Sequence, residues 1–248
     1  MSKNFELMQR VEKDKTFGSA ITVEPEILSQ GEGNNVNGHR RWASDEALRL
    51  VQQIFLLQAQ APPQVVVFAG IDHGGGCSQI CVSVAETLAK NSRRLVCLVE
   101  ANFRSPALPE FFGTTNHRGL TDALLQQGPI SSFAKPVALE NLQLISSGAL
   151  AADSPSLLTS ERLKERLAEL RGEFDFVVID APPLTQYSDA IAVGKLADGL
   201  VLILEAEATR REPAAAVAAN LRSANIPILA AVLNKRTFPI PENIYKRL

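Results

Sequence analysis

Short runs of apolar residues recur along the chain and alternate with segments in which apolar residues return at helical spacing. The runs at 176–179 and 200–204 are apolar without alternation, which is typical of strands covered on both faces. Because helical segments separate most of the runs, the pattern predicts a mainly parallel sheet between helices. The predicted strands are residues 65–70, 94–100, 141–146, 174–180, 199–204 and 228–233.

The first part of the chain has a different character. Residues 30–38 are polar and rich in glycine, and such a segment buries too little apolar surface to offset the entropy of ordering. We therefore expect a flexible N-terminal arm over residues 1–43 and a single domain over residues 44–248. The domain is predicted to begin with a helix over 44–58, which Ser44 caps.

Composition narrows the class of protein. The chain has 248 residues, of which 46% are hydrophobic, and a formal net charge of −2, so we expect a globular protein that does not bind nucleic acid. No apolar stretch approaches the roughly 18 residues of a membrane-spanning helix, and a signal peptide is not evident at the start. A cytoplasmic location is expected. Cys77, Cys81 and Cys97 form no pair at CxxC spacing and are expected to stay reduced.

A glycine-rich segment follows the first apolar run of the domain. Residues 70–79 read GIDHGGGCSQ and lie between a predicted strand and a predicted helix. In this setting the free N–H groups and the positive dipole end of the helix face a phosphate. Gly70 and Gly76 stand where a phosphate-binding loop has its glycines, and Ser78 stands where it has its magnesium-binding hydroxyl. Cys77 stands where such a loop carries its lysine.

Other interpretations of the same loop remain open. A glycine triplet between a strand and a helix also serves a tight turn that binds nothing. Cys77 is either a reactive thiol at a helix N-terminus or, as we favour, a small residue that fills the place of the lysine. A dinucleotide-binding loop is disfavoured because the GxGxxG spacing is absent.

Two other segments are predicted to reach the same edge of the sheet. Glu100, Asn102 and Arg104 end or follow the second predicted strand, and Asp180 ends the fourth. Parallel sheets bind ligands outside the carboxyl ends of their strands, so these side chains are expected to converge with the glycine loop. A carboxylate at such a strand end commonly holds magnesium in phosphate-loop proteins.

In the order and spacing of these segments, the chain resembles the catalytic domain of the bacterial tyrosine kinases (BY-kinases), which act in capsule and exopolysaccharide export. The resemblance covers roughly residues 44–248 and implies an α/β fold, a three-layer P-loop NTPase-like domain with a mainly parallel sheet between helices. Its main runs are HGGGCSQ at 73–79, VEANFRSP at 99–106 and FDFVVIDAPP at 174–183.

The resemblance implies a role for each candidate residue. It makes Glu100, Asn102 and Arg104 the counterparts of catalytic residues, and Ser78 and Asp180 the magnesium ligands of an active site. The implied nucleotide-binding residues are Gly74, Gly75, Gly76, Cys77, Ser78, Gln79 and Asn234. Asn234 equally fits a residue that caps the turn after its strand.

The chain departs from the family where the chemistry lies. Cys77 replaces the lysine, Glu100 and Asn102 replace two aspartates, and Gln79 replaces a threonine. An asparagine holds magnesium less well than a carboxylate, because this ion prefers charged oxygen ligands. Losing the charge-assisted contact of the lysine costs on the order of 1.5–3 kcal/mol of binding, and more in the transition state. We therefore expect binding of ATP and magnesium to be weak or absent.

The resemblance also implies assembly and partners. Glu46 and Arg49 fit a helix that lies between subunits in the family's rings, although such a pair also serves as simple surface support. Tyr245 is the candidate phosphate acceptor, or else an aromatic anchor for the tail. The implied partners are a membrane chain-length protein (a polysaccharide co-polymerase), which would recruit the chain to the inner face of the membrane, and related subunits.

Three functions are consistent with these features. We favour a kinase-like regulator or scaffold of exopolysaccharide synthesis and export that is catalytically impaired. One alternative is an active ATP-dependent tyrosine autokinase in which Arg104 or a neighbouring subunit's lysine compensates for Cys77. The other is a switch that binds ATP and changes assembly without transferring phosphate.

Overall fold

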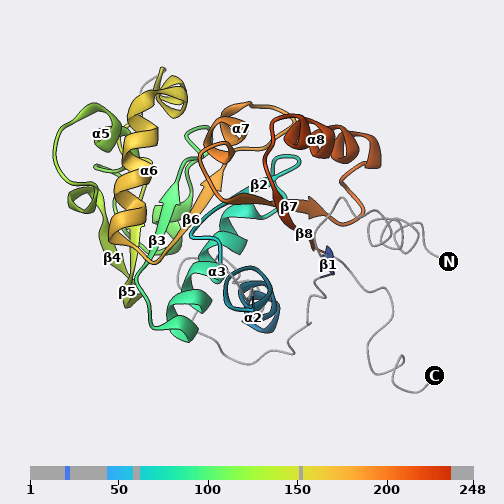
Figure 1. The fold of residues 1–248 in the computed structure, drawn as a ribbon, viewed down its shortest axis with the longest axis horizontal. Coiled ribbons are helices and arrows are strands. Elements are labelled where there is room, and N and C mark those ends of the chain that lie inside the picture. Colours follow the sequence, from blue (N-terminus) through green and yellow to red (C-terminus); the bar gives the residue numbers. More distant parts are fainter. Residues whose placement is uncertain (1–19, 23–43, 58–61, 151–152, 236–248) are drawn as a thin grey trace.

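The structure is a computed structural model that describes residues 20–22, 44–57, 62–150 and 153–235. In these residues eight strands form one sheet in the order β1-β8-β7-β2-β6-β3-β5-β4 (Figure 1). Every strand pair is parallel except β4 with β5. The strands are β1 Ala20–Thr22, β2 Val65–Gly70, β3 Val96–Glu100, β4 Lys135–Val137, β5 Leu139–Ile145, β6 Phe176–Ala181, β7 Gly199–Glu205 and β8 Ile228–Asn234.

Helices cover both faces of this sheet (Figure 1). The helices are α2 Ser44–Val51, α3 Cys77–Ser92, α4 Leu108–Phe111, α5 Leu120–Leu125, α6 Glu161–Glu173, α7 Asp189–Gly194 and α8 Arg211–Ser223. A π-helical turn, η1 Gln52–Leu56, continues α2, and two 3₁₀ turns are η2 Ile130–Phe133 and η3 Ser154–Thr159. Within the described residues, no helix has both the length and the apolar character needed to cross a membrane.

Alternation along the buried strands divides the core into two layers. Val66 and Phe68 of β2 pack toward α2 and α3, whereas Val65 and Val67 pack toward α6, α7 and α8. Successive side chains of a strand point to opposite faces, so each central strand contributes to both layers. The predicted three-layer α/β fold with a mainly parallel sheet is therefore confirmed.

The structure adds two strands that the sequence pattern did not predict. β4 is a three-residue edge strand that contains Pro136, a residue confined to edges because it cannot donate to the ladder. β1 lies within the predicted N-terminal arm and pairs in parallel with β8, with Ile21 opposite Val232. Residues 1–19 and 23–43 of that arm lie outside the described residues, so its flexibility stays a prediction.

One carboxylate stabilises the end of the sheet at which the parallel strands begin. Asp198, just before β7, accepts hydrogen bonds from the backbone N–H groups of Gln64 and Val65, each at 2.8 Å. Both its oxygens also accept from the Arg171 guanidinium of α6, at 2.8 and 2.9 Å. Burial acts to raise the pKa of Asp198, but these hydrogen bonds lower it below its ordinary value. The candidate site lies at the opposite edge.

Candidate phosphate-binding site

The glycine loop between β2 and α3 is held by the ends of two neighbouring strands. Ile71 N donates to Ile203 O of β7 at 2.9 Å, and Leu184 N, after β6, donates to Gly70 O at 2.9 Å. The Thr185 hydroxyl lies 2.8 Å from both Ile71 O and the Asp72 carboxylate. These contacts fix the first half of the loop at the carboxyl edge of the sheet, as predicted.

The second half of the loop depends on glycine and on Asn234. Gly74 and Gly76 have φ values of +87° and +82°, in the region that favours glycine. A Cβ on Gly76 would collide with the side-chain amide of Asn234. That amide donates to Gly75 O at 2.8 Å, so Asn234 joins the end of β8 to the loop. Within the described residues, the side chain of Asn234 therefore forms its hydrogen bond with the loop itself.

The loop leads into the N-terminus of a long helix. α3 has 16 residues and begins at Cys77, with Gly76 as its N-cap. The first N–H groups of a helix have no partner within it, so the loop and α3 present backbone donors to an anion. Five residues separate Gly70 from Gly76, one more than in the general GxxxxGK pattern. The position of Gly76 before the helix nevertheless leaves Cys77 in the place of the lysine.

Ser78 and Asp180 are brought together as predicted. The Ser78 hydroxyl, in the first turn of α3, donates to Asp180 Oδ2 at 2.6 Å, and the Cys81 thiol lies 3.8 Å from Oδ1. Asp180 is completely buried. Burial raises the pKa of its carboxyl to about 7, with a further contribution from the charge of Glu100, while the Ser78 hydrogen bond acts in the opposite direction.

The two thiols beside this carboxylate are poor nucleophiles. A hydrogen bond with Cys81 acts to lower the pKa of the Cys77 thiol, but burial and Asp180 raise it to about 11. Burial also raises the pKa of the Cys81 thiol well above its ordinary value. Thiolate is the reactive form of cysteine, so the interpretation of Cys77 as a reactive thiol is disfavoured.

Glu100 is engaged by the backbone and does not face an open site. Its Oε1 accepts from Ala107 N and Leu108 N at 2.6 and 2.7 Å, and its Oε2 accepts from Ser147 N at 2.9 Å. The side chain is completely buried. It therefore anchors the start of α4 and the turn after β5, a role that the sequence did not indicate.

The other two predicted catalytic positions also have local partners. Asn102 Oδ1 accepts from Ser105 N at 3.2 Å, which closes a turn after β3. The Arg104 guanidinium donates to Asp189 Oδ2 of α7 at 3.1 Å and lies 4.5 Å from the centre of the Tyr187 ring. Arg104 is thus held by α7 and by the segment before it.

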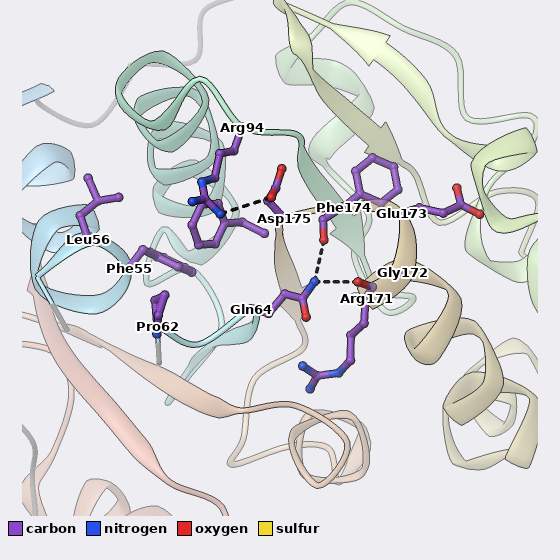
Figure 2. Close-up of a pocket in the computed structure, with 11 residues that line it drawn as sticks. Phe55, Leu56, Pro62, Gln64, Arg94, Arg171, Gly172, Glu173, Phe174 and Asp175 are labelled. Carbon is purple, nitrogen blue, oxygen red and sulfur yellow. Dashed lines mark hydrogen bonds and ion pairs between the residues drawn. The ribbon is translucent and has the colours of Figure 1, made fainter. Parts of the chain in front are cut away.

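A pocket of about 580 Å³ lies at the opposite edge, where β2 and β6 begin (Figure 2). Much of its polar lining is already paired. The Gln64 amide donates to the backbone carbonyls of Arg171 and Phe174, and Arg94 pairs with Asp175 at 3.4 Å. These pairings favour a structural role, so the glycine loop remains the candidate site.

Three further residues were predicted to act in assembly or as a phosphate acceptor. Arg49 of α2 is exposed and Glu46 is 7% exposed, and the role of this pair in a subunit interface stays a prediction. Tyr245 lies outside the described residues.

The sequence analysis missed Cys81 as part of the candidate site because it looked only for cysteine pairs at CxxC spacing. The four-residue spacing of Cys77 and Cys81 nevertheless places both side chains on one face of a helix.

The sheet order, the glycine loop before α3 and the Ser78–Asp180 pair together define a P-loop NTPase-like domain. The chain belongs to the ParA family, described as the NUBPL iron-transfer P-loop NTPase, which matches residues 63–246.

The chain is also similar to several tyrosine kinases. Tyrosine-protein kinase wzc of Salmonella typhimurium is 32% identical over 159 residues, which cover 64% of this chain and 22% of that protein. Tyrosine-protein kinase YwqD of Bacillus subtilis is 29% identical over 161 residues, 65% of this chain and 68% of that one. The kinase domain of Escherichia coli tyrosine kinase ETK has the same fold, with a TM-score of 0.77 over 97% of this chain and 98% of that domain at 16% identity. The resemblance predicted from the sequence is confirmed.

Proposed function

We propose that this chain is a kinase-like regulator or scaffold of exopolysaccharide synthesis and export whose phosphate loop does not support ordinary phosphoryl transfer. The observation that carries the proposal is the position of Cys77. It begins α3 where a phosphate loop has its lysine, and its thiol is grouped with the Cys81 thiol and Asp180. A neutral thiol supplies no fixed positive charge to the β- and γ-phosphates or to the transition state.

The acidic positions support the same proposal. The carboxylate of Glu100 accepts three backbone hydrogen bonds, so it is not available to remove a proton from a tyrosine hydroxyl. With a pKa of about 7, the Asp180 carboxyl is only partly ionised near neutral pH, which weakens it as a magnesium ligand. Magnesium, if bound, would be held by Ser78 and Asp180.

The biological setting is carried over from the relatives. The chain spans less than a quarter of the Salmonella kinase, so partners and location are proposals. The proposed partner is a membrane chain-length protein that brings the chain to the inner face of the membrane. Related subunits are the second proposed partner.

One observation favours a second candidate, an assembly switch that binds ATP without transferring phosphate. The positive-φ glycines, the N-terminus of α3 and the Ser78–Asp180 pair all remain in place. Backbone donors of this kind bind phosphate without a lysine. The active autokinase is less well supported, since Arg104, its proposed substitute cation, is engaged by Asp189 and Tyr187.

Calorimetric titration with Mg²⁺ and ATP, beside a phosphotyrosine assay, tests the proposal. We expect no measurable binding or phosphotyrosine for the natural chain, and ATP binding by Cys77→Lys. Circular dichroism of the variant would establish that the lysine is accommodated. Binding by the natural chain without phosphotyrosine would favour the switch. Phosphotyrosine formed by the natural chain and lost in Asp180→Ala would overturn the proposal in favour of the autokinase.

A further inference from the structure

Two thiols and one carboxylate converge beneath the first turns of α3. Cys77 and Cys81 are four residues apart, so their side chains project from the same face of the helix. Their sulfur atoms and a carboxylate oxygen of Asp180, at the end of β6, all lie within 4.8 Å of one another. Two ligands at this spacing on one helix face are a common way to hold a metal ion, as in the zinc-binding HExxH motif.

The distances are close to those of a tetrahedral zinc site. With Zn–S bonds of about 2.3 Å and Zn–O bonds of about 2.0 Å, neighbouring ligand atoms lie about 3.8 Å (S···S) and about 3.5 Å (S···O) apart. Cys81 Sγ is 3.8 Å from Asp180 Oδ1. The other oxygen, Oδ2, accepts a hydrogen bond from the Ser78 hydroxyl at 2.6 Å. Metal ligands are commonly oriented by such a hydrogen bond from a group that does not itself bind the metal.

Two simpler explanations fit the cluster less well. Cysteines that merely fill the core need no carboxylate beside them, whereas the Asp180 carboxyl lies at this cluster, completely buried, with the Ser78 hydroxyl and the Cys81 thiol as its described side-chain partners. A disulfide between Cys77 and Cys81 is also disfavoured. Residues four apart on a helix have Cβ atoms about 5–6 Å apart, whereas a disulfide requires about 3.5–4.5 Å.

We propose that Cys77, Cys81 and Asp180 form a binding site for a thiophilic divalent cation, Zn²⁺ in particular. Cys81 and Asp180 are buried, while Cys77 is only half-buried and lies at the loop, so the ion enters from the loop side. Three protein ligands leave a fourth tetrahedral position for water. Binding releases the thiol protons to solvent, because the thiolate is the ligand.

An occupied site would exclude magnesium and nucleotide. Two thiolates and a carboxylate carry one more negative charge than Zn²⁺ neutralises, so the filled site repels phosphate. Mg²⁺ would need the Asp180 carboxylate as a ligand too, so the two ions would compete for it. Zinc binding does not depend on the proposed loss of phosphoryl transfer, since it is measured without nucleotide.

Titration of the full, reduced chain with Co²⁺ under anaerobic conditions tests the site. We expect the thiolate-to-cobalt charge-transfer band and the visible bands of tetrahedral cobalt, saturating at one ion per chain. Zn²⁺ should displace the cobalt and abolish these bands. It should also protect Cys77 from alkylation, a readout that does not depend on the geometry of cobalt.

Matched cysteine variants separate this site from chance binding. Cys77→Ser and Cys81→Ser should each weaken cobalt binding at least about 10-fold, because losing a ligand costs more than losing an outer partner. Cys97→Ser, which changes a buried thiol on β3 outside the cluster, should bind as the natural chain does. Circular dichroism would verify that each variant is folded. Absence of the charge-transfer band, or equal weakening by all three variants, would overturn the proposal.

Discussion

The Ser78 hydroxyl donates to Asp180 Oδ2 at 2.6 Å and so joins the first turn of α3 to the end of β6. The carboxylate that accepts this hydrogen bond is completely buried and has the Cys81 thiol at its other oxygen. A hydroxyl and a thiol are neutral partners, so no cation of the described chain compensates the charge at this point. The protonation of Asp180 is therefore linked to the stability of the fold.

We predict that Asp180 makes the free energy of unfolding fall as the pH rises from about 4 to about 7. Its pKa is about 7 in the folded chain, against an ordinary value of 3.8. Within this window the folded protein keeps a proton that the unfolded chain has released, so stability is lost as the pH rises through the folded pKa. The asparagine of Asp180→Asn does not titrate, so this variant should not show that loss. The free energy of unfolding of the variant minus that of the natural chain should therefore rise by up to about 4 kcal/mol from about pH 4 to about pH 7.

Urea denaturation at several pH values, with a chelator present, measures this difference. Asp175→Asn is the matched control, because Asp175 lies just before the same strand and its side chain is 40% exposed. Its stability should follow that of the natural chain as the pH changes. If the Asp180→Asn and natural curves are parallel between about pH 4 and pH 7, the buried carboxyl does not have the raised pKa.

Glu100→Ala is predicted to destabilise the fold by at least about 3 kcal/mol. The substitution leaves the amides of Ala107, Leu108 and Ser147 without their acceptor, and each unsatisfied buried donor costs about 1–3 kcal/mol. Chemical denaturation provides the measurement. Glu140→Ala, at an exposed position of β5, should change stability by no more than about 0.5 kcal/mol. Equal effects of the two substitutions would show that Glu100 does not anchor the backbone.

Gly76→Ala is predicted to destabilise the loop by about 1–3 kcal/mol, because its φ of +82° is unfavourable for alanine. Part of the cost comes from the Asn234 amide, which the new Cβ would meet. The substitution should therefore cost at least about 0.5 kcal/mol less in an Asn234→Ala background, as a double-mutant cycle of unfolding free energies would show.

Gly172→Ala is the control for this experiment. Gly172 lies in α6, where an added Cβ meets no atom within 4 Å, so alanine should stabilise the helix by about 0.5–1 kcal/mol. Strict additivity of Gly76→Ala and Asn234→Ala would mean that the amide does not restrict the loop.

The fold was predictable where the strands are long and buried on both faces. Residues 65–70 were predicted with the bounds that the structure shows, and β7 differs by one residue. β1 and β4 were missed because each has only three residues and is stabilised by its pairing with a neighbouring strand rather than by its own apolar pattern. Such pairing is a property of the tertiary structure and leaves little trace in local sequence.

The location of the candidate site was easier to predict than the contacts of its side chains. Parallel topology was enough to place Ser78 and Asp180 together, as the structure does. It could not indicate that Glu100 reaches backbone amides seven, eight and 47 residues further along the chain, since that depends on how the loops fold back. The grouping of Cys77 with Cys81 was within reach of helical periodicity, but the carboxylate beside them was visible only in three dimensions.

The anchoring role of Glu100 makes the length of its side chain matter to the fold. Two separate segments, α4 and the turn after β5, now depend on its longer side chain for their hydrogen bonds. An aspartate at this position would be one methylene shorter and would not reach both segments. Glu100→Asp is therefore expected to lower the stability of the fold. The length of this one side chain thus links the conformations of two loops that lie far apart in the sequence.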